Sequence, residues 1–498
     1  MTVSGAGPKK PKARAQTAAT NGGRGAPGKP PAQGRSKARY QRLPTGAHGL
    51  DPEEVQRDQR ERLQTAMIEL IARHGYGAVR ILDLTKLARV SRPTFYSLYT
   101  DKEELFLGAY DEIAGRTAKV VMKAYVGEGS PGERMRRAMR AFAELAAAEP
   151  ETVSLLVLGA FGAGANALKR RNSTLEALER NILAGRSASD REGASRSKTA
   201  TVDLTVKAIL GGIREVTAAR LRKDRASELP GLSDELVVWA SSYPPKLPAG
   251  LASGARPSRR RRAGSEETVE LASERAQRAE GRLPSGRHDL SRQFIVKSQR
   301  ERIVDATAAI VARKGLAGLT IPEIARRANV SHQTFYEMYP SKHDAFLGAQ
   351  KVGLHQALLV TVEAYDEHKD DWPRAVAAGL RALIDYLSAE PAHAHLTLVD
   401  TFGASPEAIE IRDAALHAFA AYLTPGYEWA AKRNVEVPVI AAEAIAGGIW
   451  QVLHHYIENE RISELPDAAP QIVYFALTPF LGAKEAAKAA KRAPAARR

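Results

Sequence analysis

Two stretches of nine residues, SRPTFYSLY at 91–99 and SHQTFYEMY at 331–339, are nearly the same. Phe95 and Phe335 lie 240 positions apart, and the correspondence continues without a gap over residues 59–110. A repeat of this period in a chain of 498 residues predicts two similar units of roughly 200 residues plus connectors, each able to bury its own core. The sequence therefore predicts a duplicated protein.

Cysteine is absent from the chain, which excludes disulfides, a thiol nucleophile and thiolate metal sites. A reducing compartment is the simplest setting, so a cytoplasmic location is expected. The N-terminus lacks the apolar stretch of a secretory signal, and no stretch reaches the ~18 uninterrupted apolar residues of a membrane span. The closest stretch, residues 153–168, is short and contains Asn166, which favours a buried helix. No membrane partner is expected.

Positive charge dominates the composition. The formal net charge of +16 favours a polyanionic partner or basic tails. No acidic residue precedes Asp51, and the lysines and arginines before it sit among Gly, Ala and Pro, which predicts a disordered arm. The C-terminus ends in a similar stretch, KEAAKAAKRAPAARR. Such extensions either solubilise the chain or bind phosphates without regard to sequence, and the composition leaves both interpretations open.

Apolar residues recur with a helical period in both copies. Leu63, Met67 and Leu70 fall on one face of a helix after the charged sequence QRER, and a second QRER precedes the same pattern. Gly75 and Gly315 are placed to end these two helices. No segment shows the alternation of a strand. The predicted fold class is all-α, with two helical units in tandem.

Each copy also predicts two short helices separated by a tight turn. In the first, ILDLTKLARV and RPTFYSLY flank the turn at 89–91; in the second, TIPEIARRANV and HQTFYEMY flank Ser331. Ser91 and Ser331 are well placed as N-caps, because a hydroxyl there can accept from an orphan backbone N–H of the next turn. With a long amphipathic helix on each side, the motif is a helix-turn-helix whose second helix could enter a major groove.

The residues of this motif resemble the N-terminal DNA-binding domain of TetR-family transcription regulators, over residues 55–110 and 295–350. Both copies show a short helix, a turn ending in Val-Ser, a Thr-aromatic-Tyr recognition helix, another aromatic residue and a Lys-led helix. The resemblance implies double-stranded DNA as the partner. It also implies that each motif is followed by a helical domain that encloses a ligand cavity, and that the last two helices of this domain pair with a partner subunit as a four-helix bundle.

The composition shifts and the resemblance together divide the chain into seven segments. They are a disordered basic arm (1–50), a first helix-turn-helix domain (51–110), a first helical regulatory domain (111–243), a linker (244–290), a second helix-turn-helix domain (291–350), a second helical regulatory domain (351–484) and a basic C-terminal tail (485–498).

Four aromatic residues of the motif, Phe95, Tyr99, Phe335 and Tyr339, are predicted to brace the core rather than to contact DNA. The resemblance implies that the tyrosine after each Thr-Phe turns its hydroxyl to a phosphate. The lysine in the first turn of the next helix can hold a phosphate together with exposed N–H groups. The predicted DNA-contacting residues are Ser91, Arg92, Thr94, Tyr96, Lys102, Ser331, His332, Gln333, Thr334, Tyr336 and Lys342.

The two recognition helices differ where they would read bases. Arg92 corresponds to His332, and Pro93 corresponds to Gln333. Arginine suits bidentate bonding to guanine and glutamine suits adenine, so the two copies are expected to read different half-sites of an asymmetric operator.

The turn departs from the family pattern in both copies. Many relatives have Gly where this chain has Arg89 and Asn329, in a turn that can need φ above zero. Asn tolerates that conformation better than Arg, so the first turn is expected to adopt it less readily than the second.

Paired glycines recur near the end of each unit, in AILGGIREV and AIAGGIWQV. They resemble the penultimate helix of the family, where glycines permit close backbone approach. Because one chain carries two units, an intramolecular pseudo-dimer is expected, with a homodimer of the full chain as the alternative. The predicted function is a ligand-responsive repressor, in which an apolar effector of unknown identity weakens operator binding.

Other classes of function find little support in the sequence. No phosphate-cradling glycine loop, HExxH or GxSxG motif is present, so no enzymatic activity and no cofactor are expected. His393 and His395 point to different faces of a helix, as do the adjacent His454 and His455, so no metal site is expected. The alternative is a nucleoid-type protein that binds DNA without sequence preference, or binds other proteins, through its basic tails.

Overall fold

The computed structural model describes residues 40, 51–189, 204–244, 247–248, 251 and 292–492. Every regular element in these residues is a helix, and none of them forms a strand. The chain is all-α, as the apolar periodicity predicts. Most of the predicted arm and linker, and residues 493–498 of the predicted tail, lie outside the described residues.

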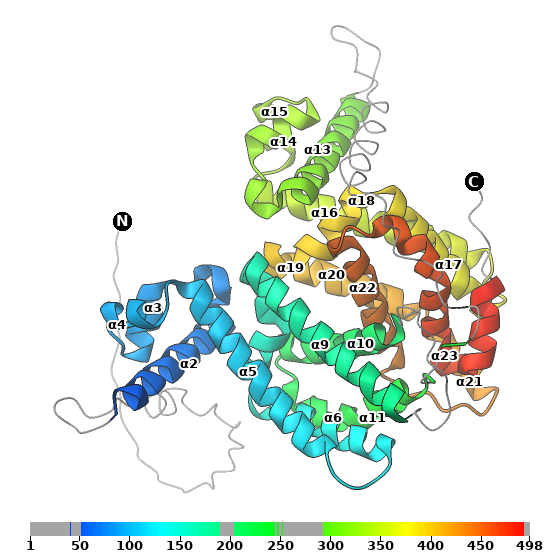
Figure 1. Cartoon of the computed structure of the whole chain (residues 1–498). Helices are drawn as coiled ribbons and strands as arrows, with labels where there is room; N and C mark the ends of the chain where they lie inside the picture. The colour runs from blue at the N-terminus through cyan, green and yellow to red at the C-terminus, as the bar shows by residue number, and fades with distance from the viewer. Residues whose placement is uncertain are drawn as a thin grey trace, which may run out of the picture. The chain divides into compact units, whose positions relative to one another are not determined.

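The first half of the chain (residues 51–244) begins with a group of four helices, shown in blue to cyan in Figure 1. The long α2 is interrupted at Gly75, where φ is 71°. Gly315 has φ 65° and follows the equivalent helix of the second half (residues 292–492), so both glycines end the regular helix as predicted. The helices of the first group are α2 (Pro52–Ala78), α3 (Ile81–Ala88), α4 (Arg92–Leu98) and α5 (Lys102–Tyr125).

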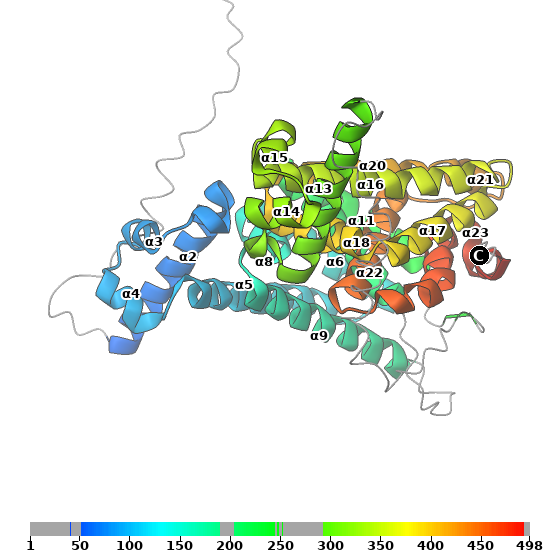
Figure 2. The same cartoon turned by 90° about the horizontal axis from the view of Figure 1, so that it is seen from above.

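The second half begins in the same way, and α14 and α15 lie beside α13 in both views (Figures 1 and 2). Its core is filled by apolar side chains of the four helices, including Ile303, Ile310, Phe335 and Phe346. The helices are α13 (Arg292–Lys314), α14 (Ile321–Ala328), α15 (His332–Met338) and α16 (Lys342–Asp366).

Most of the remaining helices of each half also correspond, although α21 has no counterpart among the described helices of the first half. Each half contains one turn of π-helix, at Leu155–Gly159 and at Leu396–Asp400, 241 positions apart, so the duplication extends to this irregular turn. The first half continues with α6 (Pro131–Ala148), α7 (Pro150–Ser154), α8 (Ala160–Gly162), α9 (Ala165–Ser189), α10 (Leu204–Arg222) and α11 (Leu229–Ser241). The second continues with α17 (Trp372–Ala389), α18 (Pro391–His395), α19 (Thr401–Ala404), α20 (Pro406–Ala421), α21 (Pro425–Ala431), α22 (Ala441–Glu458) and α23 (Leu465–Arg492).

Helix α10 of the first half packs against α22 of the second half, and α11 and α23 each contact both of them. The paired glycines lie at this crossing. A Cβ atom on Gly212 would overlap the carbonyl oxygen of Ala444, and a Cβ atom on Gly448 would lie 2.5 Å from the carbonyl oxygen of Ala208. The predicted close backbone approach is confirmed, and it joins the two halves of one chain.

The contacts at this crossing are reciprocal. Gly448 and Ala444 lie 236 positions after Gly212 and Ala208, so the two glycine contacts are equivalent by the repeat. The same shift relates Trp239, which approaches Gly212, to Phe475, which approaches Gly448. The interface therefore has the form expected of two related subunits that use the same surface on each side.

Aromatic side chains close the interface beside the glycines. The Tyr243 ring stacks on Phe475 with centroids 4.8 Å apart, and its hydroxyl donates to the Phe475 carbonyl oxygen at 3.1 Å. Trp239 packs edge-on against the same phenylalanine. One cluster of buried apolar residues thus includes α10, α11 and the regulatory helices of the second half.

Helix α23 extends further than the sequence suggested. It continues to Arg492, through residues 485–492 that the sequence analysis placed in the basic tail. The backbone bends at Gly482, where φ is 74°, and the following turns bury Ala486, Ala487 and Ala490. Burial of these alanines explains why a stretch rich in lysine remains helical.

In the part of the chain that the structure describes, no helix combines the length and the apolar character needed to cross a membrane.

The glycine crossing predicts an unusual response to alanine. Alanine normally stabilises a helix interior by about 1 kcal/mol relative to glycine. At Gly212, however, the added methyl group meets the α22 backbone, so we expect Gly212→Ala to lower the free energy of unfolding by about 1–3 kcal/mol. Gly115→Ala in α5 is the matched control, because its Cβ would meet nothing within 4 Å. Urea unfolding of both variants measures the difference; equal stabilisation by the two would contradict the close packing.

Candidate DNA-binding surfaces

The turn before each recognition helix has a left-handed residue. Arg89 has φ 53° and ψ 43°, and Asn329 has φ 51° and ψ 50°. The next residue closes the turn in the same way in both copies, with the Val90 N–H donating to Thr85 and the Val330 N–H to Ala325, each at 3.0 Å. The two turns therefore have the same geometry, although this conformation is less favourable for arginine than for asparagine.

A buried arginine holds the turn in the first copy. Arg62 of α2 donates from Nη1 to the carbonyl oxygens of Ala88 at 2.8 Å and Arg89 at 3.3 Å, and its Nε bonds Asp58 at 2.9 Å. In the second copy Arg302, 240 positions later, donates to the Asn329 carbonyl oxygen at 3.2 Å. Sequence analysis missed this role, although the repeated QRER was its visible sign.

Each recognition helix begins at the predicted serine cap. Ser91 Oγ accepts from the Thr94 N–H at 3.1 Å, and Ser331 Oγ accepts from the Thr334 N–H at 3.0 Å, so both N-cap predictions are confirmed. The threonine hydroxyls lie 2.7 and 2.9 Å from the same serine oxygens. Both side chains of each pair thus help to fix the start of the helix, and their contact with DNA stays a prediction.

The two recognition helices bury and expose the same positions. Phe95 and Phe335 are fully buried, and Tyr99 and Tyr339 are nearly so, which confirms these four residues as braces of the core. The intervening tyrosines are half exposed, Tyr96 at 51% and Tyr336 at 55%. A tyrosine body packed against a phenylalanine edge with its hydroxyl near solvent suits a phosphate contact.

The exposed faces differ in chemistry. The first helix exposes Arg92 and Pro93 at its start, whereas the second exposes His332 and Gln333. The Gln333 side-chain amide donates to Glu337 Oε1 at 3.1 Å on the next turn, which holds the amide over the exposed face. The two helices therefore present one shape with different donors and acceptors.

The lysines that lead the following helices are engaged with backbone. Lys102 Nζ donates to the carbonyl oxygens of Tyr76 at 3.2 Å and Val79 at 3.0 Å, and Lys342 Nζ donates to that of Leu319 at 2.9 Å. The Val79 and Leu319 carbonyls belong to the segment that connects the first two helices of each domain, and Tyr76 lies at the end of α2, beyond the break at Gly75. The lysines thus fasten that segment, a role that the sequence did not indicate; an ammonium has three N–H groups, which leaves at least one for a phosphate.

Two segments of the chain, residues 64–109 and 303–348, match the family described as bacterial regulatory proteins, tetR family. Each runs from the first helix of a group, through the recognition helix, into the helix that follows it. The chain carries two tandem TetR-like units. Domains of this family are those of DNA-binding transcription regulators, which is the class of protein that the two matches imply. A search of curated proteins found no match.

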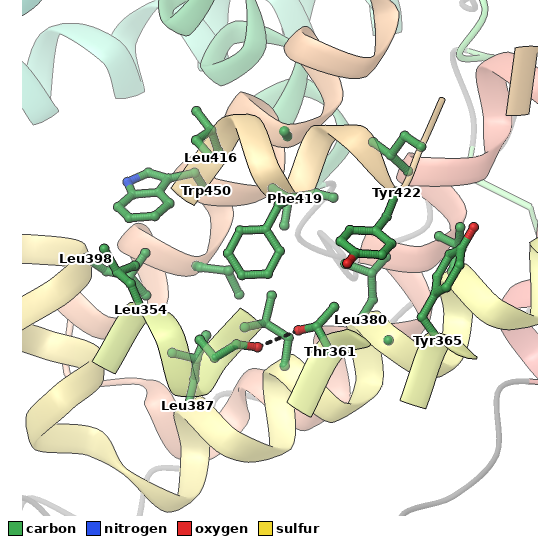
Figure 3. A pocket seen from close by; sticks show the side chains of 18 of the residues that line it. Leu354, Thr361, Tyr365, Leu380, Leu387, Leu398, Leu416, Phe419, Tyr422 and Trp450 are labelled. Carbon is green, nitrogen blue, oxygen red and sulfur yellow. Dashed lines mark hydrogen bonds between the residues drawn. The ribbon is translucent and has the colours of Figure 1, made fainter. Parts of the chain in front are cut away.

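The second TetR-like unit contains an apolar cavity of about 70 Å³ (Figure 3). Aliphatic and aromatic side chains of α16, α17, α20 and α22 line most of it, among them Leu354, Leu383, Phe419 and Trp450. The Thr361 hydroxyl, also at the wall, donates to the Ala357 carbonyl oxygen at 2.7 Å and is thereby satisfied within its own helix. The cavity offers a ligand apolar contact and few polar partners.

Charged side chains are buried where the two units meet. Arg412 donates to both carboxylate oxygens of Glu215, at 2.5 and 2.7 Å, and its guanidinium lies 4.5 Å from the centre of the Trp450 ring. Burial alone would raise the pKa of Glu215, but Arg412 and Arg222 outweigh it and lower this pKa to about 2. Trp450 thus lines the cavity on one side and contacts the inter-unit ion pair on the other.

The histidines considered for metal binding have other partners. His395 Nδ1 lies 2.7 Å from Asp400 Oδ2, and His393 Nε2 lies 3.1 Å from Asp305 Oδ1. Burial, together with nearby arginines, lowers the pKa of His454 and favours its neutral form. Among the described residues, no group of three or more His, Asp or Glu side chains could hold a metal ion.

The carbonyl bonds of Lys102 predict a loss of stability when it is replaced. We expect Lys102→Met to lower the free energy of unfolding by about 1.5–3 kcal/mol, the usual contribution of hydrogen bonds to a charged group. Lys86→Met is the matched control, because Lys86 is exposed on α3. Thermal unfolding by circular dichroism measures both. If Lys102→Met were as stable as the control, the lysine would have no fastening role and would serve DNA alone.

Proposed function

We propose that this regulator is a ligand-responsive repressor whose two helix-turn-helix units act as an intramolecular pseudo-dimer on an asymmetric operator. The observation that carries the proposal is the reciprocal packing of α10 against α22. A two-fold related interface normally joins two separate chains, and here equivalent surfaces of one chain meet each other. A homodimer of the full chain remains the alternative assembly. We further propose that the protein acts in the cytoplasm.

A tethered pair gains from effective concentration. The unit that supplies the second recognition helix is linked covalently, so pairing does not depend on protein concentration as it does in a dimer of separate chains. Each recognition helix reads one half-site, and two half-sites on one face of DNA lie about 34 Å, one helical turn, apart. Reading both half-sites therefore requires two recognition helices. One chain is thus proposed to present both helices to one operator.

The recognition helices support reading of two unlike half-sites. In the proposal, Arg92 and Gln333 read bases, while Tyr96 and Tyr336 contact phosphates from the same positions of each copy. Ser91, Thr94, Ser331, Thr334 and His332 complete the contact surface at the starts of the helices, and Lys102 and Lys342 contribute their remaining N–H groups. Phosphate contacts position the protein, whereas base contacts specify the sequence.

The apolar cavity supports an apolar effector. Its volume of about 70 Å³ is well below the roughly 150 Å³ of an engineered cavity that accepts benzene. An effector larger than a few atoms therefore has to displace the helices that line the cavity. One of them, α16, begins directly after the recognition helix, so displacement there is proposed to weaken operator binding by a coupling of about 1–3 kcal/mol.

The alternative function is DNA binding without sequence preference, and the net charge of +16 is the observation that favours it. Competition distinguishes the two. Excess random duplex should leave a sequence-specific regulator on its own promoter fragment, whereas it should displace a nucleoid-type protein as well as that fragment itself does. Regulators of this family are generally not enzymes, and we propose no catalytic activity.

The proposed role of Gln333 predicts that its replacement changes the base preference at one position of the operator. We expect Gln333→Ala to relax selection at one position of one half-site by about 1–3 kcal/mol, because a bidentate contact to adenine is lost. Tyr336→Phe should instead weaken binding to all sequences, since a phosphate contact carries no base information. Selection from a library of randomised sites measures both, with Gln356→Ala, exposed on α16, as the control. Uniform weakening by Gln333→Ala would contradict its role.

The cavity predicts that the protein binds small apolar ligands, and that a larger side chain in the cavity abolishes this binding. Xenon binds dry apolar cavities, so we expect the protein under xenon pressure to show a xenon site among the residues that line the cavity. Leu383→Phe should abolish this site. Leu359→Phe, on an exposed part of α16, should leave it intact. Xenon-129 chemical shifts measure occupancy, and equal occupancy in the two variants would contradict a ligand site at this place.

A further inference from the structure

We propose that the inter-unit interface is selective: the first unit pairs with the second and rejects a copy of itself, and the second likewise rejects its own kind. This inference rests on the proposed pseudo-dimer and adds the identity of the partner surface. It comes from comparing each ion pair across the interface with the residues at the equivalent positions of the repeat. The shape of the interface is reciprocal, but its charges are not.

The clearest pair joins α10 to α20. Arg222 donates to Asp413 with two bonds, from Nε at 2.9 Å and from Nη2 at 3.1 Å. The equivalent positions, 236 after Arg222 and 241 before Asp413, are Glu458 and Asn172. They are also bonded, with Asn172 Nδ2 donating to Glu458 Oε1 at 2.9 Å. Equivalent positions thus form an ion pair on one side of the interface and an amide–carboxylate hydrogen bond on the other. Both contacts are favourable when a first unit pairs with a second unit, which we call the mixed pair.

Pairing of like units would destroy this complementarity. Two second units would place Glu458 against Asp413, carboxylate against carboxylate, at both equivalent sites. Two first units would place Arg222 against Asn172 at both sites, so Arg222 would have no carboxylate partner from the other unit. Like charges juxtaposed at a partly buried contact oppose association, which is how many interfaces reject wrong partners.

A second pair shows the same bias. Arg220 of α10 bonds Glu443 of α22. The equivalent positions are Tyr456 and Lys207. Two first units would therefore bring Arg220 toward Lys207, two cations, although Lys207 already pairs with Glu179 of its own unit at 2.9 Å. Two second units would bring Glu443 toward Tyr456 in place of an arginine, so this ion pair would be lost.

The third pair does not discriminate against two first units. Arg412 binds Glu215 across the interface, and the equivalent positions are Arg171 and Gln451. Two first units would place Arg171 against Glu215, which is again favourable. Selectivity therefore depends on the pairs of Arg222 and Arg220, and it is stronger against two second units than against two first units.

The test cleaves the linker between the two units and measures which units then pair with each other. A site for a specific protease is placed within residues 252–290 of the full chain, and two versions carry different affinity tags at residue 1. Both are cleaved, mixed, unfolded in urea and refolded together, and recovery of the helical signal is checked. When first units are purified on one tag, we expect second units to co-purify with them freely. First units that carry the other tag should co-purify at least roughly tenfold less than random pairing would give, which corresponds to a preference of 1.4 kcal/mol. Random mixing of the two tags would overturn the proposal.

A charge exchange supplies the matched control. Asn172→Asp together with Glu458→Arg keeps this contact attractive in the mixed pair and makes it attractive between like units as well. We expect the double variant to recover the tag mixing that the unchanged protein lacks, by roughly the same factor. If neither protein mixes, the charges of Arg222 and its partners do not set the choice, and the proposal is wrong.

Failure of this inference is distinct from failure of the proposed pseudo-dimer. The native mass of the uncleaved chain at micromolar concentration reports whether pairing occurs within one chain or between two. Tag mixing after cleavage reports which units pair, whichever way the intact chain assembles. If the interface is selective but forms between two chains, the intact protein would have twice the mass of one chain and the two tags would not co-purify after cleavage. If the pseudo-dimer forms within one chain but is not selective, the intact protein would have the mass of one chain and the two tags would co-purify.

Discussion

The close approach of α10 and α22 is the constraint on which the rest of the structure depends. Glycines at 211, 212, 447 and 448 let the two backbones come nearer than any side chain would permit. That approach brings α11 and α23 into contact with both helices and buries Trp239, Tyr243 and Phe475 in one apolar cluster. The ion pairs of Arg222 and Arg412 then form at the rim and within the interface because the helices that carry them are already close.

Duplication has kept the shape of each unit and changed its chemistry. The recognition helices bury the same positions and differ at the exposed ones, as with Pro93 and Gln333. The regulatory helices behave alike: Trp450 lines the apolar cavity, whereas the equivalent residue of the first unit is Arg214. The Arg214 guanidinium donates to Gln451 of the second unit, so this position does not form an apolar wall of the same kind. The two units therefore differ both at the exposed faces of their recognition helices and in their interiors.

Much of the fold could be predicted from local sequence because the responsible interactions are local. A serine three residues before a backbone N–H makes an N-cap, and a helical period of apolar residues marks Phe95 and Tyr99 as core. The paired glycines also predicted close packing. What the sequence could not give were contacts between distant residues: Lys102 bonds carbonyls 23 and 26 positions away, and Arg222 finds Asp413 191 positions away. The sequence did not predict that the tail continues as a helix, because lysines dominate its composition. Its helical turns are held by Ala486, Ala487 and Ala490, which are buried in the apolar cluster of the regulatory helices.

The central claim is that one chain supplies both recognition helices to one operator. The most direct measurement is the stoichiometry of the complex, by native mass spectrometry of the protein on an operator fragment defined by footprinting. The account predicts one chain per duplex with two unlike half-sites protected, about one helical turn apart. Two chains per duplex, or protection of a single half-site by one chain, would contradict it.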